Sequence, residues 1–232
     1  TEIKGLNQFN TSNVTDMSGM FYSSAATSLD LSNFDTSNVT SMSIMFFKSA
    51  ATEIKGLNQF NTSKVTDMSR MFGESAATNL DLNSFDTSKV TKMSSMFWRS
   101  KATSIDLSSF DTSNVTDMTA MFKESKIITL DLSSFNTSNV TNMYEMFYQS
   151  AATSLDLSSF DTSNVTNMYM MFRESKATTL DLSNFNTSKV TDMSYMFIGC
   201  KATTGYARTQ ADADKFNASS GKPSGLTFVV KS

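Results

Sequence analysis

One motif recurs eight times along this chain, with small variations: L-x-L-x-x-F-x-T-S-x-V-T-x-M-x-x-M-F. Its central phenylalanines are Phe9, Phe34, Phe60, Phe85, Phe110, Phe135, Phe160 and Phe185. Neighbouring anchors are 25 residues apart, except for a step of 26 between Phe34 and Phe60. A fixed period of this size predicts stacked, nearly identical coils that bury a core only together. The function of such a chain depends on a long surface more than on a central pocket.

The unit over residues 27–49 shows what one coil contains. Leu29 and Leu31 alternate with polar residues, which predicts a half-buried strand, and the D-T-S-N segment after Phe34 is typical of a turn. Met42, Met45 and Phe46 have the i, i+3, i+4 spacing of one helical turn. We therefore predict a mainly β fold, a β-solenoid of eight coils of about 25 residues with a short helical turn in each.

The two ends of the repeat array differ. Residues 1–204 form the predicted solenoid, and residues 205–232 form a C-terminal cap with a helix over 209–216 and a strand over 226–230. No similar cap precedes the first coil, so we expect its edge to meet further repeats or to make end-to-end contacts. Gly5 and Gly56 are extra residues in the first strands of units one and three, which predicts a bulge there.

Composition argues against several functional classes. The chain has no histidine, the usual general base and commonest transition-metal ligand, and it shows no Ser-His-Asp set and no phosphate-binding loop. The single cysteine, Cys200, stands in a column of serines and is expected to be a small buried side chain. The two methionine columns have core spacing, so we expect packing and no metal or cofactor. We also expect no enzyme activity.

Charge and hydropathy exclude two kinds of partner. The net charge is −3 and the basic residues form no block, so we expect no nucleic-acid binding. No apolar run approaches the ~20 residues needed to cross a bilayer, so we expect no membrane insertion.

The motif also carries a family resemblance. Residues 155–172, LDLSSFDTSNVTNMYMMF, closely resemble the BspA-like leucine-rich surface repeats of bacteria, which are common in Gram-positive bacteria and mycoplasmas. The resemblance covers residues 1 to about 204, and the tail from Gly205 is similar to the segment that ends such arrays. It implies a right-handed, leucine-rich-repeat-like solenoid at the cell surface or secreted, with a role in adhesion or recognition. It supplies no catalytic residues.

Candidate binding residues are those that the scaffold does not require. Acidic residues occupy the outward position between the two leucines of several coils, and they form a ladder that could bind cations or lysines: Asp81, Asp106, Asp131, Asp156 and Asp181. The alternative is a solvated row satisfied by neighbouring hydroxyls. Exposed aromatics are typical contact anchors, and the candidates are Tyr144, Tyr169, Tyr195, Tyr148 and Trp98. We predict that Tyr144, Tyr169 and Tyr195 form one outward patch, the alternative being incidental variation.

These columns favour a surface protein that binds a host or bacterial macromolecule, protein or glycan, or that acts as a spacer. Two alternatives remain at this point. The repeated Thr-Ser columns, for instance Thr36-Ser37, could order water on a flat face, as an ice- or mineral-binding solenoid would do. An enzyme is disfavoured by the missing histidine.

Overall fold

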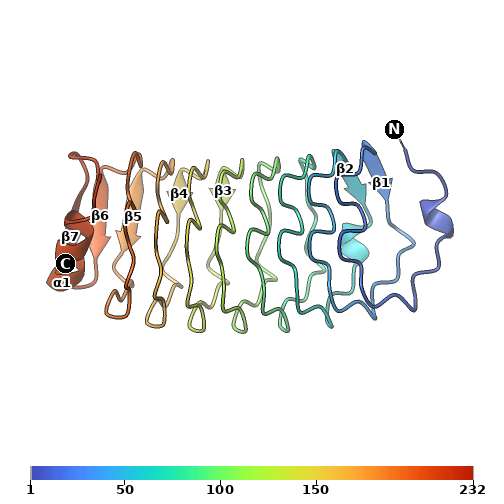
Figure 1. Ribbon diagram of the computed structural model, residues 1–232, viewed down its shortest axis with the longest axis horizontal. Coiled ribbons are helices and arrows are strands. Elements are labelled where there is room, and N and C mark those ends of the chain that lie inside the picture. The colour runs from blue at the N-terminus through green and yellow to red at the C-terminus, as the bar shows by residue number, and fades with distance from the viewer. Residues whose placement is uncertain (1, 232) are drawn as a thin grey trace.

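The computed structural model describes residues 2–231 as a rod of stacked coils, with the first coil and the C-terminal cap at opposite ends (Figure 1). The predicted mainly β solenoid of about eight coils is confirmed. The elements are η1 (Leu6–Gln8), β1 (Ser28–Asp30), β2 (Glu53–Lys55), η2 (Leu57–Gln59), β3 (Thr129–Leu130), β4 (Ser154–Leu155), β5 (Thr179–Leu182), β6 (Thr204–Ala207), α1 (Gln210–Asn217) and β7 (Thr227–Val230). Thr1 and Ser232, the outer ends of the two predicted ranges, lie outside the described residues.

Successive coils pair in parallel with each residue beside its equivalent one repeat later. Leu29 of β1 is in register with Ile54 of β2, and Leu130 of β3 with Leu155 of β4. A second ladder of parallel bridges runs along the methionine side, from Asp16 to Asp192. The leucine side is paired less continuously, because β1–β2, β3–β4 and β5–β6–β7 form separate sheets.

The segment predicted to form a short helical turn in each coil is not helical. In coil two the N–H of Met45 donates to the carbonyl of Met42, and that of Phe47 to Ile44, which makes consecutive turns. The alternate N–H groups donate to the next coil, as from Ile44 to Ser69. Ile44 has φ +50°, in the left-handed region, which no α-helix tolerates. The segment zigzags, so the methionines point inward although the backbone is not helical.

Two residues of each coil adopt this left-handed conformation. One precedes the second methionine, and in coils one to eight it is Gly19, Ile44, Arg70, Ser95, Ala120, Glu145, Met170 and Tyr195. We call this set the αL column. The other precedes the buried Ser or Cys and includes Lys48, with φ +58°. Side chains of the αL column project from a fixed, strained backbone.

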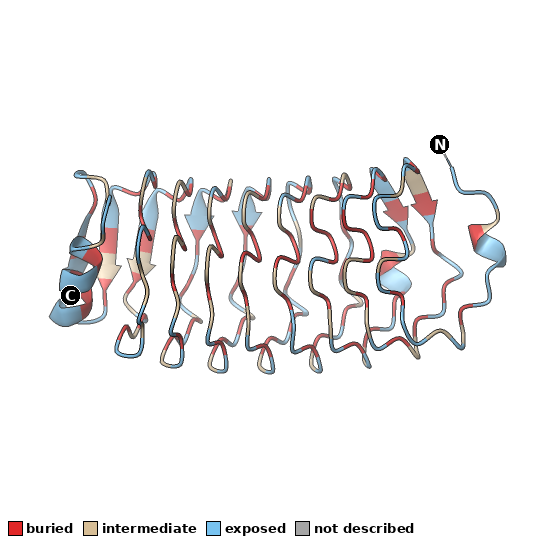
Figure 2. Cartoon of the chain, in the orientation of Figure 1, coloured by how far each residue is buried: buried red, intermediate tan, exposed pale blue. Residues whose placement is uncertain are grey.

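The core runs the whole length of the rod. Figure 2 shows that buried residues recur at the same places in successive coils. An unbroken stack of rings carries this core, with neighbouring centroids 5.4 to 6.1 Å apart. Its members are Phe21, Phe46, Phe72, Phe97, Phe122, Phe147, Phe172 and Phe197. The methionine columns pack inside it, mostly fully buried, and Cys200 is also buried.

The extra glycines of units one and three do not form bulges. Gly5 (φ +82°) and Gly56 (φ +87°) each precede a 3₁₀ helix, η1 or η2, which takes up the added residue. A Cβ on Gly56 would lie 2.6 Å from the backbone nitrogen of Ser32 on the preceding coil. Glycine is therefore required both by the positive φ and by the close approach.

The C-terminal segment covers the last coil. The hydroxyl of Thr209 accepts a hydrogen bond from the N–H of Asp212 and caps α1. Phe216 of α1 and Phe228 of β7 pack against Phe197, with centroids 5.9 and 4.8 Å away. Within residues 2–231 no helix is long and apolar enough to cross a membrane.

Candidate functional site

The Thr-Ser columns are part of the scaffold. The buried hydroxyl of Thr36 donates to the carbonyl of Asn61 at 3.0 Å and accepts from its N–H at 2.8 Å. Equivalent threonines are buried in all eight coils. The exposed row behaves similarly, since the Thr40 hydroxyl donates to the carbonyl of Thr15 at 3.1 Å. These hydroxyls hold neighbouring coils together, so the buried row offers no face to water or ice.

The aspartate ladder lies along the leucine side. Asp81, Asp106, Asp131 and Asp156 are exposed, and Asp181 is half-buried in an ion pair with Lys231 at 2.5 Å. Each carboxylate accepts a hydrogen bond from the N–H two residues later, as Asp131 does from Ser133 at 2.9 Å. The main role visible for each aspartate is thus to close its own turn.

In the middle of the ladder, these local bonds lower the pKa values of two aspartates. Hydrogen bonds from Ser133 hold the pKa of Asp131 below its ordinary value, and repulsion from Asp106 is too weak to reverse this. The pKa of Asp156 is lowered in the same way by Ser158, against repulsion from both neighbouring aspartates. The carboxylates of Asp131 and Asp156 therefore stay ionised at neutral pH without needing a bound cation.

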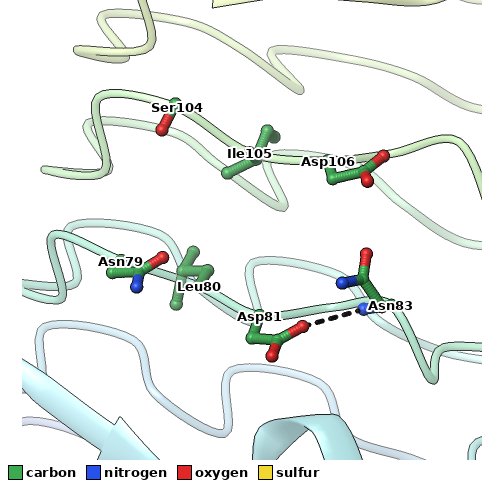
Figure 3. A pocket seen from close by; sticks show the side chains of 7 residues that line it. All are labelled: Asn79, Leu80, Asp81, Asn83, Ser104, Ile105 and Asp106. Carbon is green, nitrogen blue, oxygen red and sulfur yellow. Dashed lines mark hydrogen bonds between the residues drawn. The ribbon is translucent and has the colours of Figure 1, made fainter.

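A depression of about 410 Å³ opens on this face between coils four and five (Figure 3). Asp81 and Asp106 lie on its two sides with Asn79 and Ser104, and the carboxylate of Asp81 accepts from the N–H of Asn83. No group of three or more potential metal ligands of the His, Cys, Asp and Glu types occurs among residues 2–231. The ladder is a row of separate turns rather than a convergent ligand set.

The structure brings the three predicted tyrosines together. The rings of Tyr144 and Tyr169 stack with centroids 5.2 Å apart and 7° between their planes. Tyr195 meets Tyr169 edge-on at 5.9 Å. Tyr195 is exposed and the other two are half-buried, and burial, together with Glu145, raises the pKa of Tyr144. These three residues, the tyrosine cluster, form a continuous aromatic surface over coils six to eight.

Trp98 and Tyr148 occupy another column and are not in one patch with each other, because Lys123 takes the same position on the coil between them. Trp98 stacks on Phe47 at 6.0 Å across Gly73, where a Cβ would lie 2.8 Å from the Phe47 ring. Tyr148 has the Lys123 ammonium 4.9 Å from its ring centroid and the Arg173 guanidinium 5.6 Å away.

One surface hollow was not predicted from the sequence. A shallow hollow of about 220 Å³ lies between Trp98 and the tyrosine cluster, and its other lining residues include Arg70, Lys123, Ala120 and Glu145. The signal was present in the αL column, where small residues follow one another in coils four and five between large ones in coils three and six. We call this feature the αL hollow.

Comparison with known proteins identifies a repeat family but no characterised relative. A family described as "Mycoplasma protein of unknown function, DUF285" matches residues 1–110 and again residues 100–211. No curated protein matches the chain. No solved structure matches it either.

Proposed function

We propose, for a chain that belongs to the DUF285 family of mycoplasma proteins of unknown function, a non-enzymatic role in recognition at the cell surface. The specific kinship with BspA-like leucine-rich repeats is part of this proposal, since it rests on the motif of residues 155–172. The partner would be a surface macromolecule of the host or of the bacterium, and the protein would be displayed on the cell or secreted.

The tyrosine cluster is the observation that supports this role most directly. The repeat scaffold does not require tyrosine at these positions. Ser43, Ser69 and Ser94 occupy the column of Tyr144 and Tyr169, and Ile44, Arg70 and Ser95 occupy that of Tyr195. Stacked tyrosines on a rigid support lose little side-chain entropy on binding and offer both an apolar ring and a hydroxyl. Tyrosine is also among the residues that contribute most to binding energy at interfaces.

A binding screen against immobilised matrix proteins and glycans tests the proposal. The wild type should bind at least one of them saturably, and replacing Tyr144, Tyr169 and Tyr195 together by alanine should weaken that binding at least tenfold. Tyr22→Ala is the matched control, because Tyr22 is an exposed ring, 50% accessible, at the other end of the rod.

Three results would count against recognition through this cluster. Equal binding by the wild type and the triple variant would remove the cluster from the interface. Absence of saturable binding to every surface would favour a spacer, since a rigid stack of coils can also hold a neighbouring segment at a distance. Turnover of any bound molecule would make the protein an enzyme.

A further inference from the structure

The stack of tyrosine rings ends at coil six, and the place of the next ring is vacant. Tyr169 on coil seven covers one face of Tyr144, so the other face is directed toward coil five. The same column there holds Thr119, a small side chain, and the adjacent αL position holds Ala120. The two coils are in direct contact, because the N–H of Ala120 donates to the carbonyl of Tyr144 at 2.8 Å.

The αL hollow is this vacant place. Ala120 and Ser95 are both buried and belong to its lining, while Trp98 borders it from the neighbouring column. Trp98 is held by its stacking on Phe47 and by the Arg99 guanidinium 5.1 Å from its ring centroid. A volume of about 220 Å³ is below the ~300–1,000 Å³ of drug-sized pockets, so the hollow suits one small ring.

Two charged side chains of the hollow form an ion pair. The Lys123 ammonium lies 2.6 Å from a carboxylate oxygen of Glu145, and both side chains are largely covered, with 21% and 12% exposure. Such a pair can donate to one hydroxyl of a ligand and accept from the next. Within residues 2–231 no carboxylate forms an ion pair with Arg70, which is exposed at the other end of the hollow.

We propose that the αL hollow binds one acidic sugar unit of a surface glycan, whose ring stacks on the free face of Tyr144 and whose carboxylate meets Arg70. This assignment rests on the proposed recognition function and names its ligand class. Arg70 offers the planar fork of donors that matches a carboxylate. The Lys123 ammonium donates a hydrogen bond to one ring hydroxyl, and the Glu145 carboxylate accepts one from the next.

The charges favour a sugar over an aromatic side chain of a protein partner. A phenyl or indole ring placed on Tyr144 would cover the Lys123–Glu145 pair and take away its water without replacing the lost hydrogen bonds. A sugar ring has one apolar face for stacking and hydroxyls around its edge, so it satisfies both kinds of group. The acidic class follows from Arg70, which otherwise lacks an anionic partner in this part of the chain.

The single tryptophan of the chain lets the site be observed directly, because Trp98 borders the hollow. Titration with methyl β-D-glucuronide should change its fluorescence saturably. Methyl β-D-glucoside, which differs by lacking the carboxylate, should bind about tenfold more weakly, as expected for hydrogen bonds to a charged group. Arg70→Ala should abolish the difference between the two sugars, by lowering the affinity for the glucuronide to about that for the glucoside.

A second variant fills the hollow without new backbone strain. Ala120→Met places a methionine where the same column already holds Met170, and both positions have φ +54°. It should block both sugars, with its far-UV circular dichroism unchanged. Ile44→Met is the control, since it puts the same side chain in the αL column on coil two, away from the hollow.

Each outcome of these titrations either supports or contradicts the sugar site. A lack of saturable response to either sugar, equal affinity for both, or sugar binding that survives Ala120→Met would overturn the proposal. A saturable response to N-acetyltyrosinamide instead of the sugars would mean a protein partner. If the sugars fail while the tyrosine cluster is still required in the matrix screen, the proposed function stands and only its ligand class is wrong.

Discussion

The C-terminal cap depends on a glycine in β6 that leaves room for a phenylalanine ring of β7. Gly205 of β6 is in register with Leu180 of β5 on one side and with Phe228 of β7 on the other. The coils have leucine or isoleucine at this place, but a Cβ on Gly205 would lie 2.4 Å from Cδ1 of Phe228. The missing side chain gives room to the Phe228 ring, which packs against Phe216 at 5.0 Å. Restoring the leucine of the repeat should therefore damage the cap.

The expected losses follow from this overlap. Gly205→Ala must push a buried ring aside, and overpacking of this kind costs about 1–3 kcal/mol. Phe228→Ala leaves a cavity beside Phe216 and should cost about 3–5 kcal/mol. Gly205→Leu expels the same ring and should approach that loss. In the double variant Gly205→Leu/Phe228→Ala, the leucine fills the space left by the phenylalanine. The stability losses of Gly205→Leu and Phe228→Ala should therefore not add, and their coupling energy should reach about 3 kcal/mol.

Urea denaturation of the wild type, Gly205→Leu, Phe228→Ala and the double variant of these two measures this coupling, and Gly205→Ala is measured beside them. Amide hydrogen exchange in β7 is a local probe. Gly225→Ala is the matched control, because a Cβ there meets no atom within 4 Å, and it should change stability by less than about 0.5 kcal/mol. Additive losses in the double variant, or a Gly205→Ala protein as stable as the control, would refute the volume argument.

Three further predictions concern the coils. Thr112→Val should cost about 1–3 kcal/mol in urea denaturation, because it removes both hydrogen bonds that the buried Thr112 hydroxyl makes with the backbone of Asn136, whereas Thr112→Ser should cost much less. Lys48→Gly should be about 0.5–1 kcal/mol more stable than Lys48→Ala, the reverse of the usual order, since residue 48 has φ +58°; an unchanged order would show that the backbone there is unstrained. The folded-state pKa of Asp156 is lowered by Ser158, so its stabilisation is present above the ordinary pKa and is lost as pH falls through the folded value. The melting temperature of Asp156→Asn should thus fall less steeply than that of the wild type below about pH 4, and parallel curves would contradict this.

Sequence periodicity predicted the architecture because one rule repeats in every coil. The alternation of Leu29 and Leu31 and the stacked phenylalanine rows needed only the period and the pairing of equivalent residues. The helix in the C-terminal segment could also be predicted, since Thr209 is a good N-cap residue and acidic side chains follow it. Local chemistry and repeat logic gave the same answer in these places.

The methionine segment shows where periodicity is ambiguous. The i, i+3, i+4 spacing of Met42, Met45 and Phe46 places three side chains on one face of a helix, but a zigzag with left-handed corners does so as well. Residues such as Ile44 and Lys48 rarely adopt positive φ, so nothing in their side chains indicates those corners. Hydrogen bonds to the next coil, as from Ile44 to Ser69, stabilise the conformation, and these are long-range contacts.

The left-handed residues also explain why the candidate residues could be named from the sequence although their arrangement in space could not be predicted. Once the 25-residue register is known, Ser95 and Ala120 are seen to follow one another between Arg70 and Glu145, and that much is sequence information. Whether the column faces solvent or the core depends on the left-handed backbone, which the sequence does not indicate. In the proposed recognition function, specificity therefore lies in departures from the repeat, and those departures gain a common direction only from the left-handed corners of the scaffold.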